Sequence, residues 1–372
     1  MRRATPFQRS PSESSQDNAE VAVFCVGSPL QLICALEAKA WLGCRENILV
    51  IREPGRSRQA HRQQMARLVQ AADWRKILSW EPGGGTDLIG LRKASGCARR
   101  LARQIGSAAV YVLGGFGQLR SQMLRNHLKP LRTIVIDDGT STLQHLEHYY
   151  SRGKGMPDFM ESIVSVRGAR SWLKRQVAEL NAEVLSRPVE LFTGFDIGAE
   201  QAGSVQIHRH RFEDLKRRRA DVELDPRAVW YFGSPLSERG ILPLGMELEA
   251  LQRVAGYYAE SSPSFVYLTH RDDSAEKIEA LRKQGVLVKT LDVPAEVHFA
   301  TADKVVAHVA SSVSTALFNV SCIIDGVSAE AFPVTDLVEA SGRPAHERVT
   351  AQYRKLGIRV NDMLLGLKLQ SE

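Results

Sequence analysis

Cysteines are few in this sequence, and none of them stands at the spacing of a metal-binding or disulfide motif. There are five, an odd number scattered between Cys25 and Cys322 without a CxxC pair. This pattern excludes a zinc ribbon and a disulfide scaffold, and it indicates a reducing compartment. The sequence also has no apolar run of transmembrane length and no signal-peptide core. We therefore expect a cytoplasmic protein, with peripheral contact at the inner face of a membrane left open.

Acidic residues are outnumbered by basic ones, which gives a formal net charge of +7 and a pI near 9.2. This balance favours anionic partners such as nucleotides, acidic glycans or lipid head groups. The basic runs at residues 99–103 and 216–219 lack interleaved aromatic residues, so we expect no nucleic-acid partner. We interpret these runs as solvated helix faces and a charged linker. His208 and His210 are expected at the surface, because no third ligand stands at metal spacing.

Short β-branched runs alternate with amphipathic segments after residues 1–18, which are polar and expected to form a disordered leader. A first strand is expected over Val21–Val26, followed by a helix over Leu30–Leu42. Further strands are expected over residues 47–52, 77–80, 108–113, 133–136, 189–195, 228–232, 264–269, 286–290, 304–309 and 322–324. This alternation predicts the α/β class with doubly wound parallel sheets.

The alternation loosens once, between residues 199 and 226, where charged residues crowd together. We therefore place a linker over residues 199–226, between a first domain over 19–198 and a second domain over 227–345. Residues 346–372 are expected to form a helical segment. Two Rossmann-like domains that face each other across a cleft form the GT-B plan of many glycosyltransferases.

A short apolar run over residues 133–136 ends in Asp137-Asp138-Gly139. This pattern is typical of a buried strand followed by a turn. Because open α/β sheets bind ligands at the carboxyl ends of their strands, these carboxylates stand where chemistry takes place. A carboxylate partly shielded from water there could serve as a general base. The structural alternative is a plain turn in which one aspartate caps the next helix.

The second half carries three further features, each after an expected strand. His270, followed by Arg271, could be a general acid or donate to a phosphate, or it could only cap the next helix. Glu296 could accept from the hydroxyls of a ribose. Ser311 and Ser312, with Thr315 opening a helix, could donate to a phosphate or form an ordinary N-cap.

These features together resemble the bacterial GT-B sialyltransferases and polysialyltransferases. That family has an Asp/Glu-Asp/Glu-Gly motif in its first domain, then a His-Pro and a Ser-Ser/Thr motif in its second. Residues 137–139 match the first motif and residues 311–312 the third, in the same order. The runs GSPLQL after residue 26 and GSPL after residue 232 resemble the starts of the family's two domains. The His-Pro motif departs from the pattern, because Arg271 stands where the family has proline.

The resemblance implies an inverting transfer of a nonulosonic acid from a CMP-sugar to a glycan or glycolipid acceptor. The first domain would then be the acceptor side, with Asp137 as the base and Asp138 supporting the turn; the alternative is that Asp138 itself is the base. Ser28 and Pro29 would belong to an acceptor-side loop, and Gly139 and Arg271 would support the site. His270 would assist the leaving phosphate. The nucleotide would contact Glu296, Ser311, Ser312, Thr315 and Gly233.

The resemblance implies no cofactor beyond the CMP-sugar donor itself. No metal is expected, because CMP leaves with a single phosphate and we find no DxD-type ligand set in the sequence. Two other functions stay open. One is a transferase of the same fold that uses Kdo or another CMP-sugar, which Arg271 favours. The other is a non-catalytic protein of this fold that binds a nucleotide or glycan.

Overall fold

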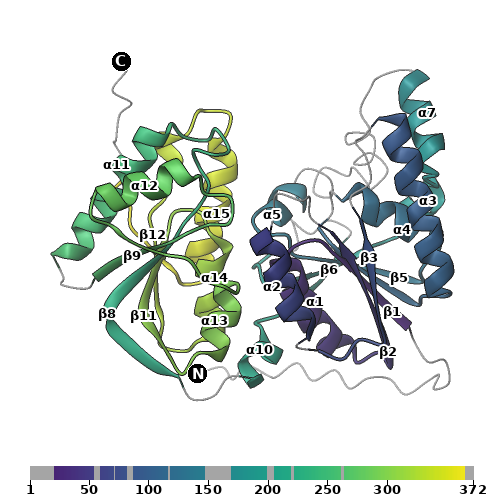
Figure 1. Cartoon of the computed structure of the whole chain (residues 1–372), viewed down its shortest axis with the longest axis horizontal. Helices are drawn as coiled ribbons and strands as arrows, with labels where there is room; N and C mark the ends of the chain where they lie inside the picture. The colour runs from purple at the N-terminus through teal and green to yellow at the C-terminus, as the bar shows by residue number, and fades with distance from the viewer. Residues whose placement is uncertain are drawn as a thin grey trace, which may run out of the picture.

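The computed structural model describes nine stretches of the chain. They are residues 21–53, 59–70, 72–81, 87–115, 118–146, 169–198, 205–218, 222–260 and 264–364. The expected leader lies outside these residues. Figure 1 shows the described chain as two α/β units side by side, the first in purple to teal and the second in green to yellow.

The first unit is built on a parallel sheet of seven strands. In spatial order these are β3 (Lys76–Trp80), β2 (Glu46–Arg52), β1 (Val21–Val26), β4 (Val110–Gly114), β5 (Arg132–Ile136), β6 (Glu190–Thr193) and β7 (Gln206–Arg209). Neighbouring strands are parallel throughout, in the order of a doubly wound Rossmann sheet. Because both faces are covered by helices, the central strands are apolar on both sides.

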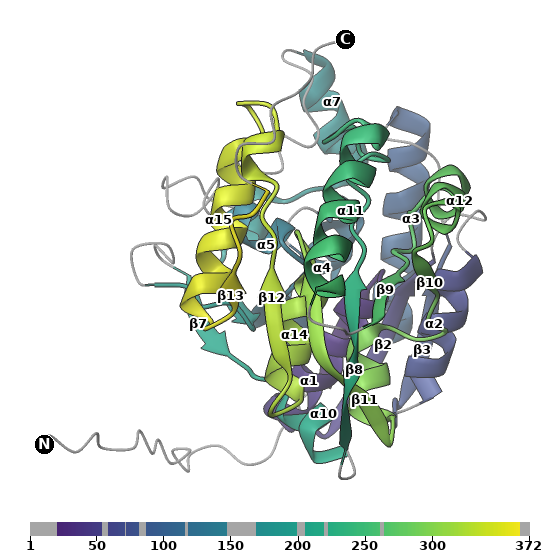
Figure 2. The ribbon, with the colours of Figure 1, turned by 90° about the vertical axis from the view of Figure 1, so that its left-hand side faces the viewer.

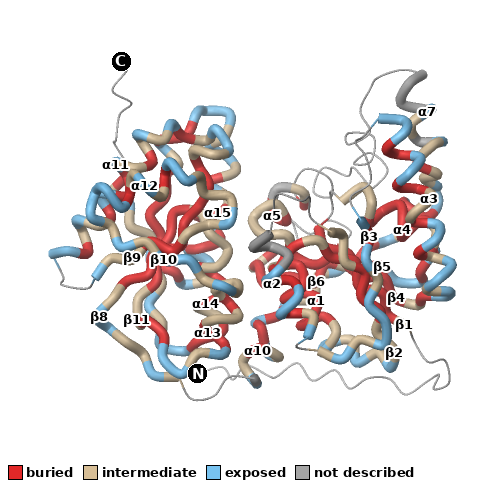
Figure 3. The backbone as a smooth tube through the Cα atoms, viewed as in Figure 1, coloured by how far each residue is buried: buried red, intermediate tan, exposed pale blue. Residues whose placement is uncertain are grey.

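The alternation of side chains along β1 shows how the two faces are filled. Phe24 and Val26 pack in one core with α1 (Pro29–Leu42) and α2 (Gln59–Gln70). Val23 and Cys25 pack in another core with the helices of the opposite face. These are α3 (Leu88–Ile105), α4 (Leu119–Leu128), α7 (Ala169–Ala178) and α8 (Ala182–Ser186). Figure 3 shows the buried strands in red between helices that are exposed on their outer sides.

The second unit repeats this plan with six parallel strands. Their spatial order is β10 (Leu287–Lys289), β9 (Ser264–Leu268), β8 (Glu223–Phe232), β11 (Lys304–Ser311), β12 (Ser328–Ala331) and β13 (Arg359–Val360). Its helices are α11 (Leu244–Ala259), α12 (Ala275–Lys283), α13 (Ala295–Thr301), α14 (Thr315–Ile323), the short η2 (Thr335–Leu337) and α15 (Arg343–Lys355). Figure 2 views this unit in front, with α11 and α15 standing along the sheet.

Both sheets change winding direction next to their first strand, between β1 and β4 and between β8 and β11. Open α/β sheets bind ligands in the crevice at such a switch point, beyond the carboxyl ends of the strands. The loops after β1 and β8 open with the same three residues, Gly27-Ser28-Pro29 and Gly233-Ser234-Pro235. These loops face a common pocket between the units, so the predicted GT-B fold class is confirmed.

Several sets of contacts among the described residues join the units, and three of them involve α10 (Glu213–Arg218), Glu37 and Gln352. The short helix α10 packs against α1 of the first unit and against α13 and α14 of the second. The carboxylate of Glu37 on α1 accepts hydrogen bonds from the backbone N–H groups of Asp214 and Leu215, at 2.9 and 2.8 Å. The side-chain amide of Gln352 on α15 bonds both backbone groups of Asp196, each at 3.0 Å.

Several local expectations were wrong. The charged stretch after residue 199 contains β7, because charges are tolerated on the edge strand of a sheet. Residues 322–324, expected as a strand, are the end of α14 and the residue after it, and the strand follows as β12. The C-terminal helix begins at Arg343 and ends at Lys355. None of the described helices is long and apolar enough to cross a bilayer.

Candidate functional site

A pocket of about 470 Å³ lies between the two units. Loops from the carboxyl edges of both sheets form its walls. The first unit contributes Ser28, Pro29, Leu30, Asp138, Gly139, Thr140 and Ser141. The second contributes residues 232–235, Arg239, residues 268–271, Leu291, residues 293–296 and residues 313–316. Nine residues singled out in the sequence therefore line one pocket: Ser28, Pro29, Asp138, Gly139, Gly233, His270, Arg271, Glu296 and Thr315.

On the first wall, the carboxylate of Asp138 is held by two side-chain amides. Gln31 donates from Nε2 to Oδ1 at 2.6 Å, and Gln118 donates from Nε2 to Oδ2 at 3.3 Å. The guanidinium of Arg52 donates to the carbonyl oxygens of both amides, at 3.1 and 2.7 Å. Because Arg52 occupies those oxygens, each amide must turn its NH₂ group toward Asp138. The donors that orient the carboxylate are therefore neutral. The cation of Arg52 bonds to the two amides and not to the carboxylate itself.

The turn after Asp138 brings the two units into close approach. Gly139 has a φ of 71°, in the left-handed region that glycine adopts without strain. A methyl group built on it would lie 3.8 Å from both Oγ1 and Cγ2 of Thr315 in the second unit. Ser141 and Thr142 fix the turn, because Ser141 Oγ donates to the Asp138 carbonyl and Thr142 Oγ1 accepts from its N–H. The first wall therefore ends directly opposite the start of α14.

On the second wall, the ring of His270 follows β9. Its Nδ1 accepts a hydrogen bond from the backbone N–H of Asp272 at 3.1 Å, so in the neutral ring the proton is on Nε2. Burial first, and then the charge of Arg271, lower the pKa of His270 to about 4. The ring is therefore a neutral N–H donor near pH 7.

The loop that carries His270 is anchored by a buried ion network. The ammonium of Lys277 on α12 is fully buried and donates to Asp273 at 3.0 Å and to the carbonyl of Ser234 at 2.8 Å. It also pairs with Glu247 and, at 3.5 Å, with Glu238. Asp273 in turn accepts from the backbone N–H of His270 at 2.7 Å. One buried lysine therefore connects the loop after β8 with the loop after β9.

Glu296 lies in the first turn of α13, at the edge of the pocket. It is buried, and its Oε1 accepts from Nδ2 of Asn319 on α14 at 2.7 Å. Burial raises its pKa. Fixed by one amide, the carboxyl group has further acceptor positions for the hydroxyl groups of a ligand.

The start of α14 brings backbone and side-chain donors to the pocket. Ser314 caps this helix, accepting from the N–H of Ala316 at 3.3 Å, and Thr315 is its first residue. The hydroxyl of Ser234 lines the same pocket, is about 93% buried, and has no hydrogen-bond partner among the described residues. A buried hydroxyl without a partner is costly unless a ligand supplies one. Helix N–H groups and a buried hydroxyl are suited to bind a phosphate.

Glycine is required where the backbone passes from β8 into the pocket. A Cβ on Gly233 would lie 2.4 Å from Oη of Tyr267 and 2.8 Å from the carbonyl oxygen of Leu268. Its own N–H donates to that carbonyl at 2.9 Å. Any larger residue would push the loop after β8 away from β9, and Ser234 would move with it.

Three of the predicted site residues do not line the pocket. Asp137 turns into the sheet, where it accepts from Thr193 Oγ1 at 2.7 Å and from the N–H of Gly194 at 2.8 Å. Ser311 belongs to β11 and donates to the carbonyl of Phe232 at 2.8 Å. Ser312 is buried and shares a hydrogen bond of 2.5 Å with the hydroxyl of Tyr231. Asp137 and both serines are therefore bonded inside their own units, and Asp138 and Ser314, which follow them in the chain, line the pocket.

His210 is buried, which corrects its expected place at the surface. Its ring stacks on Phe192, and neither ring nitrogen has a hydrogen-bond partner in the described part of the chain. Its Nε2 lies 3.9 Å from Oδ2 of Asp137, and burial raises the pKa of Asp137 to about 7.

With Cys34, these two residues form the one group of three metal-ligating side chains found among the described residues, all within 4.8 Å. Zinc ligands about 2.0–2.3 Å from the ion lie closer together than this. Both oxygens of Asp137 are also already bonded, so we assign no metal to the group.

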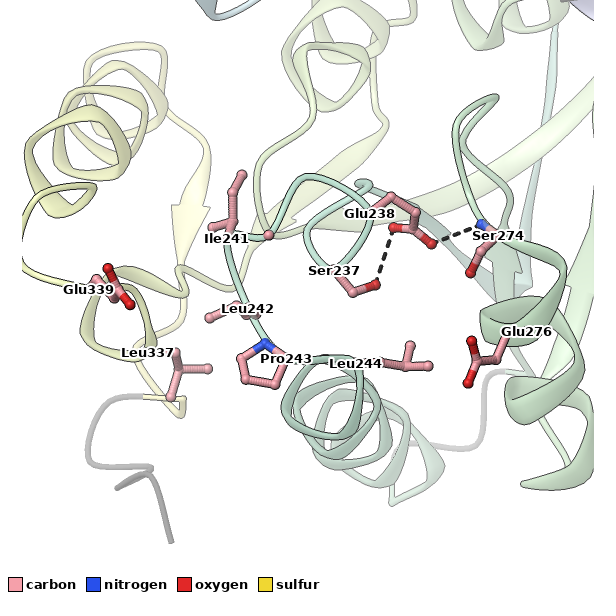
Figure 4. Close-up of a pocket in the computed structure, with 11 residues that line it drawn as sticks. Ser237, Glu238, Ile241, Leu242, Pro243, Leu244, Ser274, Glu276, Leu337 and Glu339 are labelled. Atoms are coloured by element: carbon pink, nitrogen blue, oxygen red, sulfur yellow. Dashed lines mark hydrogen bonds between the residues drawn. The ribbon is translucent and has the colours of Figure 1, made fainter. Parts of the chain in front are cut away.

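A second pocket, of about 600 Å³, is lined by the second unit alone (Figure 4). Leu242, Pro243, Leu244 and Leu337 form its apolar part, and Glu238, Glu276 and Glu339 bring three carboxylates to it. Glu238 accepts from the N–H of Ser274 at 2.8 Å, as Figure 4 shows. Three carboxylates disfavour a phosphate, so this second pocket is less suited to an anion than the pocket between the units.

Sequence reasoning missed Gln31, Arg52 and Gln118, the residues that hold Asp138. They come from three distant segments of the first unit. Gln31 stands in the run GSPLQL, but Arg52 and Gln118 carry no local motif, so no signal in the sequence could have joined the three. It also missed Ser234 and Arg239 on the second wall. The repeat of Gly-Ser-Pro at residues 27–29 and 233–235 was a usable signal for Ser234.

No family model matches the sequence, and no curated relative is found for it. Solved structures similar to this chain include UDP-GlcNAc 2-epimerase from Methanocaldococcus jannaschii, at 9% identity over 89% of this chain and 92% of that one, with a TM-score of 0.41. MurG of Acinetobacter baumannii is 12% identical over 92% and 85%, with a TM-score of 0.40. The spinosyn forosaminyltransferase SpnP is 13% identical over 91% and 90%, with a TM-score of 0.45. At these distances the matches assign neither a donor nor an acceptor to this chain.

Proposed function

We propose that the protein is an inverting glycosyltransferase that moves a nonulosonic acid from a CMP-sugar to a glycan or glycolipid acceptor. The observation that carries the proposal is the pocket between the units. It joins a carboxylate from one domain with a histidine, a buried glutamate and a helix start from the other. A base and a leaving-group site on opposite walls suit a displacement in which the attacking and departing groups lie on opposite faces of the sugar.

Asp138 is the base in this mechanism, in place of Asp137. Only Asp138 of the two lines the pocket, and its carboxylate is oriented by Gln31 and Gln118 without a direct ion pair among the described residues. It takes the proton from the acceptor hydroxyl as that oxygen forms its bond to the anomeric carbon. The bond from this carbon to the phosphate oxygen breaks, and CMP leaves with the electron pair.

The second wall holds the departing nucleotide. The N–H of His270 donates to the phosphate, together with the start of α14 and the hydroxyl of Ser234, so negative charge develops where donors are already placed. Glu296 accepts from the ribose hydroxyls. A nucleotide with one phosphate fits this wall, because Arg239 and Arg271 are both engaged with Asp272, at 3.4 and 3.9 Å.

Nucleotide binding tests the proposal. Thermal shift is measured with CMP, CDP, UDP, GDP and ADP, each without and with Mg²⁺. We expect CMP to raise the Tm selectively, and Glu296→Gln and Ser234→Ala to reduce this shift. The matched control is Glu339→Gln, which removes a carboxylate from the second pocket of Figure 4 and should leave the shift unchanged.

Selective stabilisation by UDP or another diphosphate would overturn the CMP donor and leave a glycosyltransferase with a different nucleotide. Stabilisation by none of the nucleotides would overturn the transferase proposal itself.

A further inference from the structure

The outward face of α3 is strongly basic. Leu91, Ala94, Ala98 and Leu101 face the core. Five exposed cations lie on the other side: Arg92, Lys93, Arg99, Arg100 and Arg103. At 100° per residue, these five cations share one side of the helix. The helix contains no acidic residue, so this face has one sign of charge along its length.

Few of these cations are neutralised by neighbouring side chains. Arg99 pairs with Glu179, the residue that follows α7 by one position. The other four make no ion pair with any described residue. They therefore present positive charge to a partner outside the chain.

Apolar side chains stand beside this charge. Ile89 is 68% exposed and Leu88 is 39% exposed, at the first turn of the helix. An acidic polysaccharide would gain little from an exposed isoleucine, whereas a bilayer surface accepts apolar side chains between its head groups. Lys and Arg side chains next to such residues are attracted to anionic lipids.

We propose that the outward face of α3, with Leu88 and Ile89 at its tip, docks the protein on an anionic membrane surface. The placement fits the site. Because α3 follows β3 in a parallel sheet, its first turn lies at the carboxyl edge, the edge that also carries Ser28 and Asp138. α3 itself covers the face of the first sheet that is turned away from the second unit (Figure 1), so a bilayer there would contact the first unit, which is the acceptor-side unit of the proposed function.

Vesicle binding tests this inference with the full chain. Co-sedimentation is measured with phosphatidylcholine vesicles and with vesicles that contain about 30% phosphatidylglycerol, at low and at high salt. We expect binding only to the anionic vesicles and a steep loss with salt. Each cation near an anionic surface contributes about 1 kcal/mol. The triple variant Arg92→Ala, Arg100→Ala, Arg103→Ala should therefore bind about 100-fold more weakly.

The matched control removes the same charge from exposed helix positions of the second unit, in Arg253→Ala, Arg282→Ala, Lys283→Ala. Its vesicle affinity should change by less than about 3-fold, because screened charges far from the contact contribute little. Equal loss in both triple variants would show that net charge alone drives binding and would overturn the proposed face. Failure of the wild type to sediment with anionic vesicles would overturn it as well.

An insertion reporter separates a membrane from a soluble polyanion. The variant Ile89→Trp should shift its emission to shorter wavelength on anionic vesicles, relative to the wild type. An unchanged emission together with tight binding of dextran sulfate would assign the face to polyanions and overturn membrane docking. The CMP-induced thermal shift should be the same in the α3 variants and the wild type, so the outcome here is independent of the proposed transferase activity.

Discussion

The two walls of the pocket hold their reactive side chains by different means. On the first wall, Asp138 is oriented by two neutral amides, and the charge of Arg52 is one hydrogen bond further away. On the second wall, the loop of His270 is anchored by Lys277, a fully buried ammonium surrounded by carboxylates. One wall orients a charged group with neutral donors, and the other orients a neutral group with buried ions.

This difference follows from what each wall has to do in the proposed reaction. Amide donors fix the position of Asp138 without placing a cation in direct contact with its carboxylate. A histidine held neutral donates to a phosphate without bringing a proton that must be moved. The charged network stays behind the second wall, where it sets loop geometry and does not touch the ligand.

The largest effect should come from removing the base on the first wall. Asp138→Asn keeps the shape and removes the proton acceptor, so we expect the transfer rate to fall about 10²- to 10⁴-fold. The Tm and the CMP-induced shift should be retained. The rate is measured as CMP release from the donor in the presence of a glycan acceptor.

The neighbouring carboxylate supplies the contrast. Asp137→Asn removes an acceptor inside the sheet and should chiefly lower the Tm, because Thr193 and Gly194 lose part of their partner. A folded Asp137→Asn protein without activity, beside an active Asp138→Asn protein, would show that the two roles are reversed.

The second prediction concerns the anchor of the second wall. Lys277→Met leaves three carboxylates without their buried cation, and breaking such a pair costs about 3–5 kcal/mol. We expect a corresponding fall in the free energy of unfolding, measured by urea denaturation. Lys283→Met, which removes an exposed lysine of the same helix paired with Glu279, should change it by less than about 0.5 kcal/mol. An equal fall in the free energy of unfolding for the two variants would show that the second wall is not anchored by its buried cation.

The smallest effect is a pH dependence of the free energy of unfolding. Its sign is opposite for His270, on the second wall, and for Asp137, behind the first wall. The pKa of His270 falls from 6.5 to about 4 on folding, so the folded protein binds fewer protons between these values. Stability from this residue is therefore lost as the pH falls from 6.5 through 4. The pKa of Asp137 rises from 3.8 to about 7, and stability from it is lost as the pH rises through that window.

The difference between two proteins isolates the histidine. The urea midpoint of His270→Gln, relative to the wild type, should rise as the pH falls from 6.5 to 4. Asp137 contributes equally to both proteins, so its slope cancels. A constant difference across this range would mean that the ring is not held neutral by folding.

The fold could be predicted from the sequence because strand and helix periods alternate regularly. The switch points could be placed because both loops after the first strands begin with Gly-Ser-Pro. Which of two adjacent side chains points into the pocket could not be predicted. Asp137 and Asp138 are consecutive, and consecutive side chains at a strand end point in opposite directions. An error of one position in the strand end therefore exchanges the proposed base, Asp138, with the buried hydrogen-bond acceptor, Asp137.

The serine pair shows the same limit on the second sheet. The expected strand ended at Val309, but β11 continues to Ser311, and the Ser311 hydroxyl bonds back to β8. The pocket is therefore formed by Ser314 and Thr315, a few residues further on. The end of a strand depends on pairing with residues that are distant in the sequence, here Phe232. Local composition does not indicate that pairing.

The order of elements along the chain has a consequence for synthesis on the ribosome. Every strand of the first sheet, together with α10, precedes Glu223, so the first unit has all its strands before any strand of the second sheet has been made. Glu37 can already bond the start of α10 at that stage. Domains generally fold as units during translation, the N-terminal one first. Gln352 is made only after β12 and binds Asp196 only then, so α15 joins a newly made unit to one that is already folded.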